Sequence, residues 1–152
     1  MEIMILKKGR LVIVFTLRQD KKILKRNMFI YLGVSIFVAV FGIIYEMFSH
    51  NVYSIYMEFA FVIPLVLGLI PYTLFYFFNK SMHPSEVVSD LYNAGVVTLI
   101  VASLYKGVLD IYGTTRDVHL LTLTISGFIL LGLGILTYIV TIIYHIKHSK
   151  NI

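Results

Sequence analysis

The stretch Leu120–Ile146 reads LLTLTISGFILLGLGILTYIVTIIYHI and contains no Asp, Glu, Lys or Arg. A helix needs roughly 20 apolar residues to cross a hydrocarbon core of about 30 Å, so this stretch is long enough to span a membrane. A helix buried in a soluble bundle would keep a polar outer face, whereas this one is apolar nearly all round. The stretch therefore predicts an all-α integral membrane protein.

Three other stretches have the length and the apolar character of a membrane span. The segments between the spans are too short to hold a folded domain, and short connections place sequential helices antiparallel to one another. Pro64 and Pro71 lie inside the second span, where each removes a helical hydrogen bond and tends to kink the helix. We therefore expect a four-transmembrane-helix bundle of up-down-up-down topology over residues 28–152. Its expected spans are Met28–Phe48, Ile55–Phe78, Leu91–Ile111 and Leu120–Ile146.

The composition of the whole chain agrees with this class. The 152 residues are 59% hydrophobic and 14% charged, with a mean hydropathy of +0.87, whereas soluble domains are about 45–50% apolar and about 25% charged. The chain has no cysteine, which excludes a disulfide framework, a thiol nucleophile and cysteine-ligated zinc or iron–sulfur sites. It also has no phosphate-binding loop, so we do not expect it to drive transport with ATP by itself.

The net charge of +5 is concentrated at one end of the chain. Eight of the thirteen Lys and Arg residues lie in residues 1–27, which we interpret as a short basic cytoplasmic or interfacial N-terminal segment rather than as a nucleic-acid-binding surface. Lysine and arginine beside the spans mark the cytoplasmic side, so we expect both termini in the cytoplasm and the protein in the plasma (inner) membrane. The side chains expected to contact anionic lipid headgroups are Arg18, Lys21, Lys22, Lys25 and Arg26.

The conformation of residues 1–27 has three alternatives. The apolar runs Ile3–Leu6 and Leu11–Leu17 are separated by Lys7-Lys8-Gly9-Arg10, a pattern that fits a small hairpin. The same pattern fits a helix that lies on the membrane surface with its basic side toward anionic lipid. Disorder is the third alternative, because short apolar runs alone do not separate these structures.

Ionisable side chains inside a membrane are costly and are the first place to look for function. In the expected spans they gather near the extracytoplasmic ends. In the first span Ser35, Ala39 and Gly42 precede Glu46 at intervals of three and four residues, and His119, Thr122 and Ser126 have the same spacing at the start of the fourth. If these faces point inward, they form a polar, acidic pocket open to the outside. The expected pocket residues are Glu46, His50, Glu58, Lys106, Asp110 and His119.

A structural interpretation of the same residues stays open. Lys106 would pair with Asp110 one helical turn further on, and Glu46 and Glu58 would lie in the water of the headgroup region. Tyrosines near both ends of the spans have the distribution of an aromatic belt. At the cytoplasmic end these tyrosines are Tyr31, Tyr76, Tyr92 and Tyr144.

A metal site is a further alternative at the outer end. Glu46 and His50 are four residues apart on one helix face, and His119 could approach from the fourth span. A carboxylate with imidazoles suits zinc or another transition metal. Apart from this metal, we expect no cofactor.

These features favour an accessory, sensor or regulatory subunit that docks on another membrane protein. The alternative is an oligomeric transporter or channel for a small cationic solute or ion, which would use Glu46, Glu58, Lys106 and Asp110. A metal-dependent membrane enzyme ranks third, because no complete catalytic set can be assembled. The expected partners are the lipid bilayer, anionic headgroups at the cytoplasmic face, and either further copies of the chain or another membrane protein.

Overall fold

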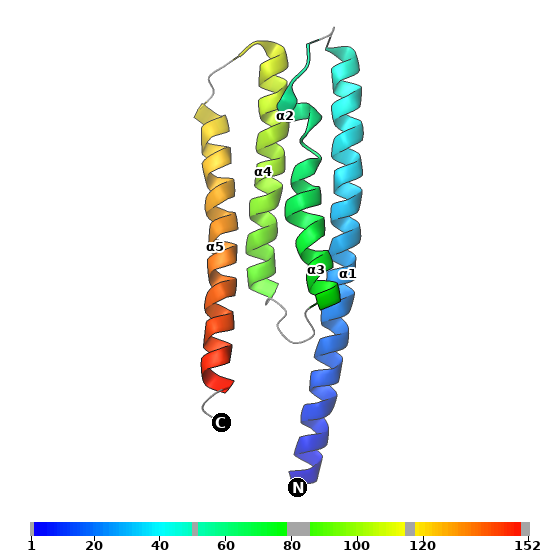
Figure 1. Ribbon diagram of the computed structural model, residues 1–152, viewed down its shortest axis with the longest axis vertical. Helices are drawn as coiled ribbons and strands as arrows, with labels where there is room; N and C mark the ends of the chain where they lie inside the picture. The colour runs from blue at the N-terminus through cyan, green and yellow to red at the C-terminus, as the bar shows by residue number, and fades with distance from the viewer. Residues whose placement is uncertain (1, 50–51, 79–85, 115–117, 150–152) are drawn as a thin grey trace.

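The computed structural model describes residues 2–49, 52–78, 86–114 and 118–149 (Figure 1). These residues are almost entirely helical and contain no strand. Three of the helices are long and apolar enough to cross a membrane, which confirms an all-helical integral membrane protein. The elements are α1 (Glu2–Phe48), α2 (Ile55–Glu58), the π-helix η1 (Pro64–Leu69), α3 (Ile70–Phe78), α4 (Glu86–Tyr112) and α5 (Val118–Ser149).

The basic N-terminal segment is not a separate element. It is the first half of α1, which runs for 47 residues without a break and extends beyond the other helices in Figure 1. The hairpin alternative for residues 1–27 is therefore wrong for residues 2–27. A helix satisfies its own backbone groups, whereas an isolated two-stranded hairpin is marginally stable at best. At about 1.5 Å per residue α1 is more than twice as long as the hydrocarbon core is thick.

The second apolar stretch, Ile55–Phe78, is a broken helix rather than a kinked one. The regular helix α2 ends at Glu58, and a turn leads into the π-helix that begins at Pro64. A second proline, Pro71, lies in the first turn of α3. Each proline lacks the N–H that a helix would use, so the stretch changes its hydrogen-bonding pattern twice.

Two side chains of α4 satisfy carbonyl groups at these breaks. The N–H of Ala60 donates to Met57 O at 3.3 Å and not to Tyr56 O four residues back, and Ser103 Oγ donates to Tyr56 O at 2.9 Å. Pro71 has no N–H to offer to Leu67 O, which instead accepts a hydrogen bond of 2.7 Å from the hydroxyl of Tyr92. Unsatisfied backbone groups cost several kcal/mol in lipid, so these two bonds hold the broken segment against α4.

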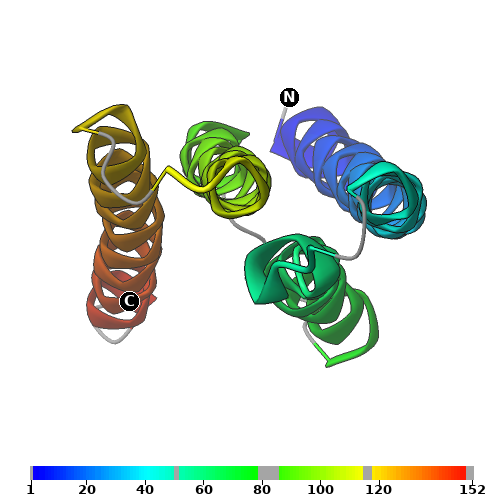
Figure 2. The same cartoon turned by 90° about the horizontal axis from the view of Figure 1, so that it is seen from above.

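The elements pack side by side with α4 near the middle, between α5 on one side and the α2–α3 segment on the other (Figures 1 and 2). Met57 joins α1 to α4: it is 1% exposed and lies between Gly42 and Gly107, where an added Cβ would come within 3.1 Å and 2.8 Å of it. α1 also packs against η1 and α3. The buried core therefore lies where α1, the broken segment and α4 meet.

Close backbone approach joins α4 to α5. A Cβ added to Gly95 would lie 2.5 Å from the backbone N of Leu131, and one added to Gly134 would lie 3.0 Å from the Cα of Tyr92. Small residues permit such approach between helices in lipid. Because the residue numbers rise along α4 as they fall along α5 in these pairs, the two helices are antiparallel.

We expect Tyr92→Phe to lower the free energy of unfolding by about 1–3 kcal/mol, because it removes the hydroxyl donor to Leu67 O, a partly buried acceptor to which Pro71 offers no N–H. Unfolding is followed by the loss of helical circular dichroism during SDS titration in mixed micelles. Tyr112→Phe is the matched control, since Tyr112 is 82% exposed. Equal stabilities of the two variants would contradict this role for the Tyr92 hydroxyl.

Candidate functional site

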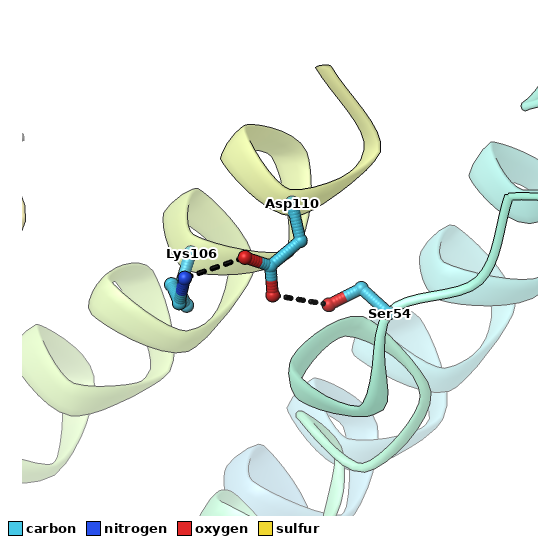
Figure 3. Close-up of polar contacts among 3 residues, drawn as sticks. All are labelled: Ser54, Lys106 and Asp110. Carbon is cyan, nitrogen blue, oxygen red and sulfur yellow. Dashed lines mark hydrogen bonds and ion pairs between the residues drawn. The ribbon is translucent and has the colours of Figure 1, made fainter. Parts of the chain in front are cut away.

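The charged residues that meet in the structure form a small cluster between α4 and the start of α2 (Figure 3). Lys106 Nζ pairs with Asp110 Oδ1 on the same helix. Ser54 Oγ donates to the other carboxylate oxygen, Asp110 Oδ2, at 3.0 Å. Lys106 Nζ also lies 5.5 Å from the centroid of the Tyr56 ring, a distance at which a cation is attracted by an aromatic face.

This cluster fixes the entry into α2. The carbonyl of Ser54 accepts the N–H groups of Met57 and Glu58, so Ser54 begins the helix, while its hydroxyl is turned to Asp110. Ser54 is 3% exposed. The lysine charge is balanced by the aspartate next to it, and this pairing is the one that the structural interpretation of the sequence predicts.

The other expected pocket residues differ in their surroundings. Glu58 and His119 have exposed side chains. Glu46 is partly buried, and within the described residues its Oε1 atom is buried without a hydrogen-bond partner. His50 lies outside the described residues. The acidic pocket as a whole stays a prediction.

The polar faces of the spans differ in orientation. In α1, Ser35 is 4% exposed and Gly42 packs against Met57, so this face points into the bundle. In α5, Thr122 is exposed and its Oγ1 donates to Val118 O of the same helix. The expected polar face of the fourth span therefore does not point into the bundle at Thr122.

The proposed metal and lipid contacts are placed only in part. Within the described ranges no group of three His, Asp or Glu side chains lies close enough to hold a metal, and the set of Glu46, His50 and His119 includes a residue outside those ranges. Lys21, Lys22, Lys25 and Arg26 have exposed side chains, as headgroup contacts require; the side chain of Arg18 lies outside the described part.

A second polar cluster, near the opposite end of α4, was missed by the sequence reasoning. The hydroxyls of Tyr31 and Tyr72 both donate to Asn93 Oδ1, at 2.8 Å and 2.7 Å, and the two rings stack with centroids 5.7 Å apart. The side chains of Asn27 and Ser89 lie beside the Tyr72 hydroxyl. This cluster links α1, α3 and α4 through neutral groups.

A signal for this cluster exists in the sequence. Asn27 and Tyr31 are four residues apart, as are Ser89 and Asn93, so each pair lies on one helix face. The interpretation of the tyrosines as an aromatic belt hid this pairing for Tyr31. Polar side chains that bond across helices hold membrane helices together, so both polar clusters suit a role in positioning the helices.

No known protein family, curated protein or solved structure matches the chain.

We expect Lys106→Met to lower the free energy of unfolding by about 1–2 kcal/mol. The change leaves the Asp110 carboxylate without its counter-charge, and removing one partner of a fully buried pair costs about 3–5 kcal/mol. The smaller value applies here because the two side chains are 23% and 27% exposed, which weakens the pair.

The double variant Lys106→Met/Asp110→Asn should recover most of this loss, since the neutral amide keeps an acceptor for Ser54 Oγ. Both variants are compared by SDS titration in mixed micelles, with Lys22→Met as the exposed control. A double variant less stable than Lys106→Met would contradict the proposed pairing.

Proposed function

We propose that the chain crosses the membrane four times as an up-down-up-down bundle, with both termini in the cytoplasm and the protein in the plasma (inner) membrane. The contacts between Tyr31 and Asn93 and across Met57 support a parallel course of α1 and α4. Two helices that cross in the same direction need a segment that returns between them. The broken stretch Ile55–Phe78 is that segment, and the basic flank of α1 supports its cytoplasmic start.

The absence of native cysteine makes this topology testable with single thiols. A thiol can be placed at three exposed positions, one in each of three variants: Lys22→Cys, Val52→Cys and Thr114→Cys. With four spans, a membrane-impermeant maleimide added to intact cells should label positions 52 and 114, and should label position 22 only after permeabilisation.

Position 114 separates the alternatives. If the broken stretch did not cross, Thr114→Cys would lie on the same side as Lys22→Cys. Labelling of positions 22 and 114 under the same condition would therefore rule out the four-span topology.

We further propose that the protein is an accessory subunit that docks on another membrane protein through α5. The observation that carries this proposal is an uncovered glycine. A Cβ added to Gly42, Gly68, Gly95, Gly107, Gly127 or Gly134 would lie within 4 Å of another element, whereas one on Gly132 of α5 or on Gly33 of α1 would meet nothing within 4 Å. The lower burial of α5 favours Gly132 over Gly33 as the docking position. Glycine in a helix costs about 1 kcal/mol relative to alanine, and an uncovered glycine leaves room for a partner helix.

The burial of the helices supports the same face. In the most apolar part of α5, 11% of the residues are buried within the chain, compared with 33% in the corresponding part of α4. Most polar side chains near the core bond within the chain, in the Lys106–Asp110 pair and the Asn93 cluster, whereas Ser35 Oγ and Glu46 Oε1 are buried without a partner among the described residues. A single chain thus offers a docking face more readily than a charged path across the membrane.

The docking role predicts that Gly132→Leu abolishes a complex without unfolding the chain. The complex is solubilised from native membranes in mild detergent and its protein mass is measured by size-exclusion chromatography with light scattering. Gly33→Leu is the matched control, because Gly33 also has nothing within 4 Å but lies on α1. Wild type and Gly33→Leu should elute with a different membrane protein, and Gly132→Leu as the 17.4 kDa chain alone.

Two outcomes would overturn the accessory role. The first is a wild-type particle that contains this chain alone. The second is a cation flux by the purified protein in liposomes that is lost in Glu46→Gln, which would favour the transporter. The buried, unpartnered Oε1 of Glu46 is the observation that favours this second candidate.

A further inference from the structure

A cavity of about 180 Å³ lies between α3, α4 and α5, near the end of the bundle where α3 ends and α4 begins. Its walls include Pro71 and Phe75 from α3, Val88 and Tyr92 from α4, and Tyr138 from α5. The cavity is partly open rather than enclosed, so in a membrane it can be filled from outside the chain.

The lining is almost wholly apolar because the protein uses the hydroxyls of its tyrosines elsewhere. Tyr72 donates its hydroxyl hydrogen to Asn93, and Tyr92 donates to Leu67 O. Neither acceptor lines the cavity, so the rings form the wall. Ordered water in a protein needs two to four polar partners, and this lining does not offer them.

Contacts beside the cavity fix the positions of the three helices that form its walls. Gly134 lies against the backbone of Tyr92, where an added Cβ would come within 3.0 Å of the Tyr92 Cα. This contact fixes the spacing of α4 and α5. The rings of Phe75 and Tyr138 meet edge to face, with centroids 5.5 Å apart, which fixes α3 against α5. Collapse of the cavity would break one of these contacts.

We propose that this cavity binds one alkyl chain of a membrane phospholipid. The cavity is partly open, and the helices α3 and α5 that line it also carry exposed apolar side chains, among them Phe77 and Leu136. An apolar cavity of about 150 Å³ in another protein stays dry and takes up benzene, so this one has room for a comparable length of hydrocarbon. In a bilayer the hydrocarbon at hand is the lipid chain.

The test uses two neighbouring phenylalanines of α3. The wild-type protein is reconstituted in phosphatidylcholine–phosphatidylglycerol vesicles that contain a trace of phosphatidylcholine with a photoreactive diazirine in one chain. After irradiation, labelled residues are assigned by mass spectrometry. Phe77 is 69% exposed, whereas Phe75 is partly covered and lines the cavity. A chain held in the cavity should label Phe75 and Tyr138 more than Phe77, and random contact with lipid should give the opposite order.

A pair of adjacent valines supplies the variants. Val88→Phe adds bulk to a cavity wall, and Val87→Phe adds the same bulk at a position that is 77% exposed. We expect Val88→Phe to abolish the labelling of Phe75 and Tyr138, and Val87→Phe to leave it unchanged. Should Val88→Phe lose its helical circular dichroism, Ile135→Phe at the rim, where Ile135 is 42% exposed, should abolish the labelling instead.

Three results would overturn the proposal. Labelling of Phe77 above Phe75 in the wild type would show that no chain enters the cavity. Equal labelling in folded Val88→Phe or Ile135→Phe and in Val87→Phe would show that the label does not come from the cavity. Labelling by a photoreactive free fatty acid, but not by the phospholipid probe, would assign the cavity to a different amphiphile.

Discussion

Backbone groups inside a bilayer have no water to bond to, so every group released by a break in a helix must be satisfied by protein. The stretch Ile55–Phe78 has two such breaks, and side chains of α4 donate a hydrogen bond at each. Ser103 donates to Tyr56 O, and Tyr92 donates to Leu67 O. The segment that cannot form a regular helix must therefore lie along α4. This requirement places α4 near the middle of the bundle.

The remaining polar contacts act at the two ends of the same interface. Near one end Ser54 bonds to Asp110, and near the other Tyr72 bonds to Asn93. Four side-chain bonds thus join α4 to residues 54–78. Between α4 and α5 the backbones approach closely at Gly95 and Gly134. Polar bonds specify a register more strictly than apolar contact does, so the broken segment and α4 form the fixed part of the structure.

Hydropathy and helical spacing predicted what depends on short range in the chain. The apolar stretches within α1, α4 and α5 follow from composition, and the pairing of Lys106 with Asp110 follows from a spacing of four residues. The break after Glu58 and the bonds of Ser103 and Tyr92 depend on which carbonyl meets which hydroxyl across two helices, and one sequence does not contain that register. The continuity of α1 was missed because an apolar run of β-branched residues, Leu11–Leu17, fits a strand as well as a helix.

The second break in the stretch Ile55–Phe78 and the cavity involve the same two residues. Pro71 removes the donor for Leu67 O and also forms part of the cavity wall, and Tyr92 supplies the missing bond while its ring forms another part. A continuous α-helix at this position would give Leu67 O its usual N–H donor, so the bond from Tyr92 would not be needed to satisfy that carbonyl. Because the Tyr92 hydroxyl bonds to Leu67 O, only the apolar ring of Tyr92 faces the cavity. Pro71 thus takes part both in the backbone break that the Tyr92 hydroxyl satisfies and in the wall of the cavity.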